Sequence, residues 1–149
     1  MKKLIAYFSA SGTTAAAAAA LAGLTGASLY EIRPEVPYTA SDLDWTDKGS
    51  RSSVEMKDGS SRPAISGKLP DTGAYDAVYI GFPIWWGVAP RIIDSFIGGC
   101  SLAGKDIAVF ATSGGSGIEP AVRDLKRKYP LLRIRTGRLL DGRVTEDIL

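Results

Sequence analysis

Histidine is absent from this chain of 149 residues, and cysteine occurs once, as Cys100. Without histidine the chain lacks the usual proton shuttle near neutral pH, any histidine-based triad, and the commonest ligand of zinc and iron sites. We therefore expect no metal site and no catalytic side chain. One cysteine forms no disulfide within the chain, which is typical of a reducing compartment such as the cytoplasm.

The sequence also lacks a strong charge of one sign and a long apolar run. Its net charge is +2, which argues against nucleic acid or an anionic membrane as a partner. No stretch reaches the roughly 18 apolar residues of a membrane span, and the apolar residues 4–8 are too few for a signal peptide. The basic residues of 123–128 are expected on a solvated helix face. The length fits a single domain, residues 1–149.

Short apolar runs alternate with helical stretches along the chain. Strands are expected at residues 4–8, 28–32, 77–82, 106–111 and 132–135. Helices are expected after residue 14, from Pro90 through residue 97, and at 119–128. Continuous apolar strands that alternate with helices indicate a parallel sheet covered on both faces.

The segment 33–70 interrupts this alternation, because it is too long for an ordinary connection. It contains four of the chain's prolines, and SRSSVEM within it has the length of about two helical turns. We expect a partly irregular connection that lies over the edge of the sheet. Its length is typical of a functional loop, and its serine and glycine content is equally typical of mobility.

Hydroxyl groups dominate the loop after the first strand, SASGTT at residues 9–14. Ser9, Ser11, Thr13 and Thr14 supply hydroxyls, and Gly12 lets the backbone approach a ligand closely. The helix that follows adds free N–H groups and the positive end of its dipole. An N-cap needs one such residue, so the pattern favours a phosphate site. It matches neither the Walker nor the G-x-G-x-x-G pattern, which disfavours ATP, GTP and Rossmann-type NAD.

Two further loops follow the third and fourth strands. GFPIWWG, residues 81–87, contains adjacent tryptophans whose side chains diverge in an extended segment, one inward and the other toward the cleft. An indole face suits an aromatic ligand, and the alternative is packing in the core or an interface. TSGGSG, residues 112–117, permits close backbone contact with a planar ligand, and the alternative is a simple turn. All three loops are expected at the carboxyl edge of the sheet.

These loops resemble those of the flavodoxin family. SASGTT fits the family's phosphate-loop pattern [ST]-x-[ST]-G-x-[TN], and GFPIWWG and ATSGGSG are similar to the two flavin-flanking loops of bacterial members. The resemblance covers nearly the whole chain. It implies an α/β fold, a three-layer αβα sandwich with a five-stranded parallel sheet of order 2-1-3-4-5, and FMN as the cofactor.

The resemblance also implies a role for each loop. The FMN 5′-phosphate would be held by Ser9, Ser11, Gly12, Thr13 and Thr14. The isoalloxazine ring would be flanked by Pro83, Ile84, Trp85, Trp86 and Gly87, with one tryptophan stacked on it. Its other side would be lined, through backbone N–H groups, by Thr112, Ser113, Gly114, Gly115 and Gly117. At Gly87 a peptide near the flavin can reorient at little cost.

The sequence departs from the family in its charge, in its poorly marked second crossover helix and at its end. Many flavodoxins are strongly acidic, whereas this chain is slightly basic, so its redox partner protein is not identified by charge. The chain ends in GRVTEDIL, where the family pattern continues into a full final helix that Thr145 would cap. A shortened end or a covering partner subunit is expected there, which leaves a monomer or a homodimer.

Three functions remain open at this point. The first is an FMN-containing electron carrier, which needs no acid–base residues. The second is an FMN-dependent NAD(P)H oxidoreductase with a quinone-type acceptor, whose pocket the segment 33–70 would shape. The third is a binding module that recognises another phosphate ligand or a protein. A shared fold does not decide among them.

Overall fold

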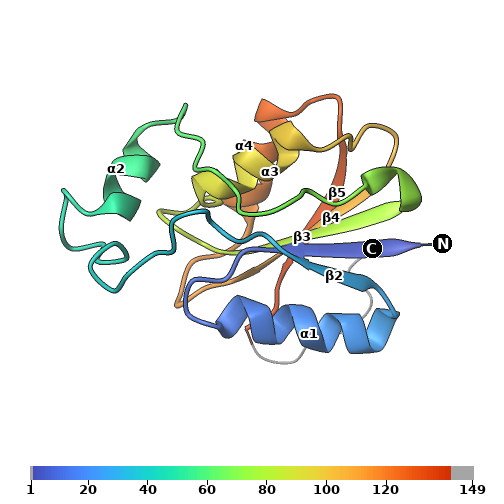
Figure 1. The fold of residues 1–149 in the computed structure, drawn as a ribbon, viewed down its shortest axis with the longest axis horizontal. Helices are drawn as coiled ribbons and strands as arrows, with labels where there is room; N and C mark the ends of the chain where they lie inside the picture. Colours follow the sequence, from blue (N-terminus) through green and yellow to red (C-terminus); the bar gives the residue numbers. More distant parts are fainter. Residues whose placement is uncertain (1, 142–149) are drawn as a thin grey trace.

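A parallel five-stranded sheet forms the centre of the molecule (Figure 1). The computed structural model describes residues 2–141. The strand order is β2-β1-β3-β4-β5, as the resemblance implied, and every neighbouring pair is parallel. The elements are β1 (Lys3–Tyr7), α1 (Thr13–Thr25), β2 (Ser28–Glu31), α2 (Arg51–Lys57), a 3-10 helix (Thr72–Ala74), β3 (Ala77–Pro83), α3 (Arg91–Gly99), β4 (Asp106–Thr112), α4 (Glu119–Lys128) and β5 (Arg133–Leu139).

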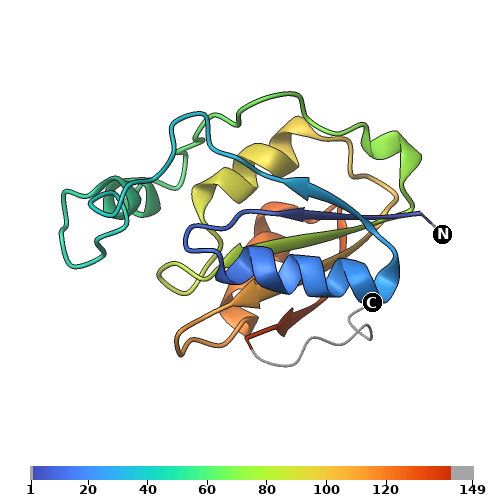
Figure 2. The same ribbon diagram turned by 60° about the horizontal axis from the view of Figure 1, so that its bottom comes forward.

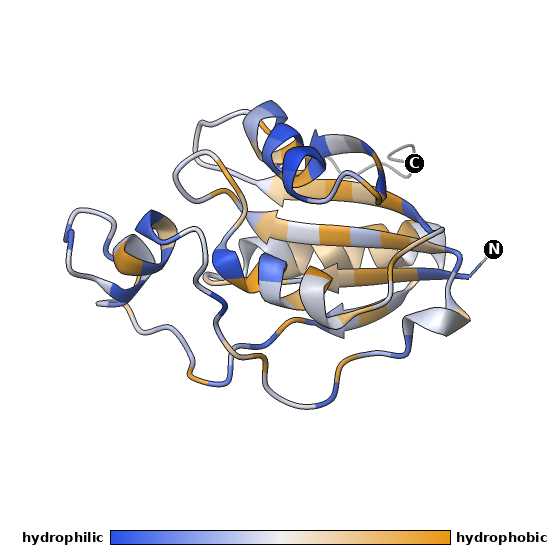
Figure 3. Cartoon of the chain, turned by 90° about the horizontal axis from the view of Figure 1, so that it is seen from above, coloured by the Kyte–Doolittle hydropathy of each residue, from blue (hydrophilic) through white to orange (hydrophobic). Residues whose placement is uncertain are grey.

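Helices cover both faces of the sheet, which gives the predicted three layers. Figure 2 shows α1 in front of the sheet and α3 behind it. Successive residues of a strand point to opposite faces; in β1, Leu4 and Ala6 pack with α3 and α4, whereas Ile5 packs with α1. The central strands are apolar along most of their length (Figure 3), because both of their faces are buried.

The alanine-rich helix α1 is held close to the sheet by its small side chains. Ala17, Ala18 and Leu21 are buried against Tyr79 of β3. Alanine has the highest intrinsic helix propensity, so this segment needs few specific contacts to remain helical. The helix ends at Gly26, whose φ of +71° and N–H bond to the Ala22 carbonyl form a left-handed C-cap. None of the helices within residues 2–141 is long and apolar enough to cross a membrane.

The basic end of α4 is not wholly a solvated face. Lys128 Nζ lies 2.8 Å from a carboxylate oxygen of Asp94, which α3 holds in the core at 1% exposure. The Tyr129 hydroxyl donates to the same carboxylate at 2.6 Å, and burial together with this bond raises the pKa of Tyr129. Lys128 therefore joins α4 to α3, because a carboxylate this deeply buried requires paired, hydrogen-bonded neighbours. Only part of the expected surface cluster is exposed to solvent.

The strand β5 continues past residue 135 to Leu139, farther than the sequence indicated. Its pairing with β4 extends to Ala111 beyond a register shift between Ile107 and Ala108. Exposed arginines at this edge of the sheet interrupt the apolar pattern, so the sequence does not predict the full length of the strand. The end of the chain, where a shortened final helix or a covering partner subunit is expected, lies outside the described residues.

The long segment 33–70 contains α2, the short helix predicted there, but its position differs from the expectation. Backbone bonds from Glu35 to Ala64 and from Ser66 to Arg33 close the segment at its base. We call residues 35–64, between these bonds, the α2 lobe. Figure 1 shows that the lobe projects beyond the carboxyl ends of the strands and does not lie along the sheet edge.

Candidate functional site

Three loops meet at the carboxyl edge of the sheet, as expected. We call residues 9–14, 81–87 and 112–117 the first, second and third loops. They lie at the carboxyl ends of β1, β3 and β4, which are adjacent in the sheet. The buried hydroxyls of Thr14 and Thr112 are 2.8 Å apart and join the first loop to the third. The Ile84 N–H donates to the Thr112 carbonyl at 3.0 Å and joins the second loop to the third.

The first loop is shaped by Ser9 and Gly12. Ser9 Oγ accepts hydrogen bonds from the N–H groups of Gly12 and Ala15, both at 3.1 Å. Gly12 has a φ of +94°, a left-handed conformation that a residue with a side chain adopts only under strain. The Ser9 hydroxyl proton stays available for donation, because its oxygen acts as the acceptor in both bonds.

Several backbone N–H groups at the start of α1 have no hydrogen-bond acceptor among the described residues. The N–H groups of Ser11, Thr13 and Thr14 make no hydrogen bond within residues 2–141; the last two belong to the first turn of α1, where no intrahelical acceptor exists. The exposed hydroxyls of Ser11 and Thr13 are 3.4 Å apart. A hydrogen bond to a charged group contributes about 1.5–3 kcal/mol and the helix dipole about 0.3–1 kcal/mol. The loop thus gathers unpaired donors at one helix terminus, which is the arrangement that an anion site requires.

The Thr14 side chain is buried, although its place in the motif predicts a hydroxyl that contacts phosphate. Its side chain is 1% exposed and its hydroxyl is paired with that of Thr112, itself 4% exposed. These hydroxyls hold the loops together in the interior. A phosphate contact from Thr14 stays a prediction that rests on its backbone N–H.

The second loop ends in a strained turn after Pro83. Bonds between Trp85 and Val88 run in both directions, at 2.9 and 3.1 Å. The central residues Trp86 and Gly87 have φ values of +50° and +82°, the signature of a type I′ turn. Asparagine or glycine is usual at the first of these positions, and another L-residue costs about 1–2 kcal/mol there. Strain of this kind is concentrated at functional sites.

The two tryptophans of this loop diverge, in agreement with the sequence. Trp85 is half-buried and packs edge-on against Phe8 and Tyr38, at ring-centroid distances of 5.6 and 5.4 Å. Trp86 is 52% exposed and has no ring partner among the described residues. Which of the two stacks on a ligand remains a prediction.

The third loop closes on itself. Ser113 Oγ accepts from the N–H groups of Gly115 and Ser116, at 3.2 and 2.8 Å. The Ser113 N–H donates to the Asp141 carboxylate at 2.6 Å. The N–H groups of Gly114 and Gly117 make no hydrogen bond within residues 2–141. The loop therefore offers fewer free donors than its glycine content suggests, and its contact with a ligand stays a prediction.

Sequence reasoning missed the residues that attach the α2 lobe to the second loop. Tyr38 contacts Trp85, donates from its hydroxyl to Glu55, and lies 3.7 Å beneath the guanidinium of Arg51. Burial and the bond to Glu55 raise the pKa of Tyr38, which stays a neutral donor. Arg91 of α3 donates to the Glu55 and Met56 carbonyls at the end of α2. These contacts produce no local hydrophobic periodicity from which the sequence could predict them.

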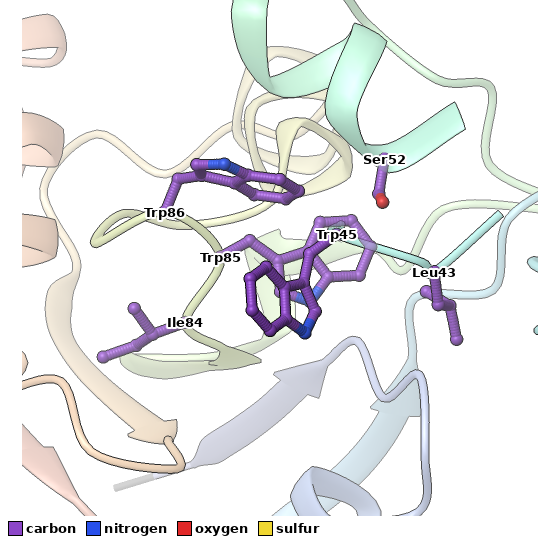
Figure 4. Close-up of a pocket in the computed structure, with 6 residues that line it drawn as sticks. All are labelled: Leu43, Trp45, Ser52, Ile84, Trp85 and Trp86. Atoms are coloured by element: carbon purple, nitrogen blue, oxygen red, sulfur yellow. The ribbon is translucent and has the colours of Figure 1, made fainter. Parts of the chain in front are cut away.

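The lobe and the second loop enclose a cavity of about 280 Å³ (Figure 4). Its lining comprises Leu43, Trp45, Ser52, Ile84, Trp85 and Trp86. Sequence reasoning missed Trp45, although a lone tryptophan in a polar segment with no core pattern was an available signal.

Comparison with known proteins identifies the family and similar structures. The sequence matches the flavodoxin family over residues 2–149. The chain belongs to the flavodoxin family. Its structure is similar to the crystal structure of a Bacteroides eggerthii protein, with a TM-score of 0.94 and 55% identity over 96% of this chain and 90% of that one. A Bacteroides uniformis protein gives a TM-score of 0.94 and 53% identity over 98% and 93% of the two chains.

A more distant flavodoxin-like structure shares the fold. The flavoprotein of Lactobacillus acidophilus, solved in complex with FMN, has a TM-score of 0.75 and 23% identity over 94% of this chain and 93% of that one. At this level of identity the similarity shows a shared fold. No curated protein matches the sequence.

Proposed function

We propose that this chain binds FMN where the three loops meet and acts as an electron carrier. The observation that carries the proposal is the N-terminus of α1, where the first loop presents three N–H groups without acceptors among residues 2–141, beside two exposed hydroxyls. Membership of the flavodoxin family supports it, as does the FMN bound to the L. acidophilus flavoprotein of the same fold.

The residues of the three loops fit FMN. Ser9, Ser11, Gly12, Thr13 and Thr14 would hold the 5′-phosphate, and the second and third loops would flank the isoalloxazine ring. Bound FMN supplies electron transfer in one- or two-electron steps. The turn at Trp86–Gly87 contributes a backbone whose conformation glycine leaves adjustable. None of the three loops contains an acidic or basic side chain, which favours a carrier over proton-transfer chemistry.

The test is an FMN titration of the purified protein, followed by anaerobic photoreduction. We expect a yellow one-to-one complex and two resolved one-electron reduction steps. A colourless protein that ignores added FMN would overturn the cofactor assignment. A single two-electron step would overturn the carrier assignment and leave FMN binding intact.

The cavity between the α2 lobe and the second loop favours a second candidate. An FMN-dependent NAD(P)H oxidoreductase needs a pocket beside the flavin, and a carrier does not. Stopped-flow mixing of the FMN complex with NADPH and with NADH separates the two candidates, because rapid flavin reduction is expected of the oxidoreductase alone.

A further inference from the structure

The cavity under the α2 lobe borders the second loop, which is also proposed to flank the flavin ring. Its lining comes from residues 43–52 of the lobe and 84–86 of the second loop. No residue of the first or third loop lines it. The cavity therefore lies on the side of the second loop that faces α2, beside the place where the three loops meet. Figure 4 shows Ser52 and the indoles of Trp45 and Trp86 around this space.

Two tryptophans at this cavity are exposed without a packing reason. Trp45 is 73% exposed and Trp86 is 52% exposed, and neither makes a ring contact with another described residue. Trp85, by contrast, is packed against Phe8 and Tyr38. Trp86 also has the strained φ of +50°. Large exposed aromatic surfaces that line one hollow mark a recognition site.

The charged side chains that line the hollows at these tryptophans have one sign. A second hollow, of about 480 Å³, shares Trp45 and Trp86 with the first and is also lined by Lys48 and Lys57. These lysines are the charged residues among those that line the two hollows. Neither forms an ion pair with a described residue. Two unpaired ammonium groups beside apolar rings suit a ligand that is both flat and negatively charged.

We propose that Trp45, Trp86, Lys48 and Lys57 form a second small-molecule site, which takes a planar aromatic anion. The ring lies against the indoles, and the anionic group lies toward the lysines. Binding at this site does not depend on FMN; its position next to a flavin rests on the proposed function.

The experiment is calorimetric titration of the FMN-saturated protein with naphthalene-2-sulfonate. The neutral 2-naphthalenemethanol is the matched probe, since it keeps the ring and lacks the charge. Both probes are redox-inert, so binding is measured apart from electron transfer. We expect one site that prefers the sulfonate by about tenfold or more, and a preference that weakens with added salt. If the protein takes up no FMN, the same titration is carried out on the protein alone.

Variants locate the site on the structure. Trp45→Ala is expected to weaken sulfonate binding about tenfold, Trp45→Phe to retain most of it, and neither to alter FMN affinity. Lys48→Gln and Lys57→Gln are expected to reduce the preference for the sulfonate. Lys68→Gln, an exposed lysine outside both hollows, is the control and leaves binding unchanged.

Four results would overturn the proposal. They are no binding to the native protein, equal binding of the two probes, full binding by Trp45→Ala, and competition between FMN and the sulfonate for one place. The last result would assign the hollow to the flavin itself. Circular dichroism confirms that each variant is folded.

Discussion

The first and third loops have almost the same composition, yet their free backbone N–H groups lie in different settings. Each contains a serine, Ser9 or Ser113, whose Oγ accepts two N–H groups from the residues that follow. The first loop leads directly into α1 and leaves three further N–H groups free. In the third loop the Ser113 N–H is taken by Asp141, and the next helix begins only at Glu119.

The difference shows that serine and glycine content does not by itself make an anion site. Free donors must converge, and the start of a helix is what makes them converge in the first loop. The third loop also leaves two N–H groups, those of Gly114 and Gly117, without an acceptor within residues 2–141, but no helix begins at either of them. Four tests address this contrast, from the largest expected effect to the smallest.

The largest effect is expected at Gly12. Gly12→Val, alone or with Ser11→Ala, forces a branched side chain into a φ of +94° and displaces the free N–H groups. We expect FMN affinity to fall about 100-fold or more, which corresponds to about 2.7 kcal/mol. Fluorescence titration of FMN measures this change.

Gly26→Val is the matched control, because Gly26 closes the other end of α1 with a φ of +71°. An added Cβ meets no atom within 4 Å at either glycine. Both variants should lose about 1–3 kcal/mol of stability through backbone strain, a fall in Tm of about 2–4 °C per kcal/mol. Equal FMN affinities in the two variants would contradict the role of the first loop.

The second test makes the same change in both loops. Ser9→Ala removes the acceptor of two N–H groups at the start of α1, so FMN affinity should fall about tenfold, or about 1.4 kcal/mol. The loss of these two bonds should also lower the free energy of unfolding by about 1–3 kcal/mol. Ser113→Ala should change FMN affinity by less than about twofold. A larger loss at Ser113 than at Ser9, in paired titrations, would reverse the comparison.

The third test separates the connection between the loops from their contact with ligand. Thr14→Val or Thr112→Val leaves the other hydroxyl buried without a partner, at a cost of about 1–3 kcal/mol in the free energy of unfolding. The double variant should cost less than the sum of the two, because it removes both polar groups. Urea denaturation measures the cycle. Strict additivity would show that the 2.8 Å contact contributes nothing to stability.

The sheet and its loops were predictable because their causes are local. The strand 77–82 is apolar at nearly every position, as expected of a strand buried on both faces. The first-loop motif places hydroxyls, Gly12 and the start of a helix within six consecutive residues. Gly26 likewise marks the end of α1 by a rule that concerns a single position.

The remaining features depend on contacts between distant residues. Thr14 meets Thr112 across 98 positions, so the motif alone suggests a ligand contact for a hydroxyl that is buried. The bond between Tyr38 and Glu55 spans 17 positions in an irregular segment, and it helps to hold the α2 lobe at the second loop. Lys128 was read as a surface charge because its partner, Asp94, lies on another helix.

The smallest effect is expected at Asp141, whose carboxylate accepts the Ser113 N–H at 2.6 Å. Asp141→Asn keeps an oxygen acceptor and removes a negative charge near the proposed site of an anionic cofactor. FMN affinity should rise about twofold at low salt, and the gain should disappear at high salt, since exposed charges are screened. Asp71→Asn is the matched control: Asp71 accepts the Gly73 N–H at 3.0 Å, before β3 and thus at the opposite edge of the sheet. An equal gain in the control would mean that net charge, and not the third loop, sets the effect.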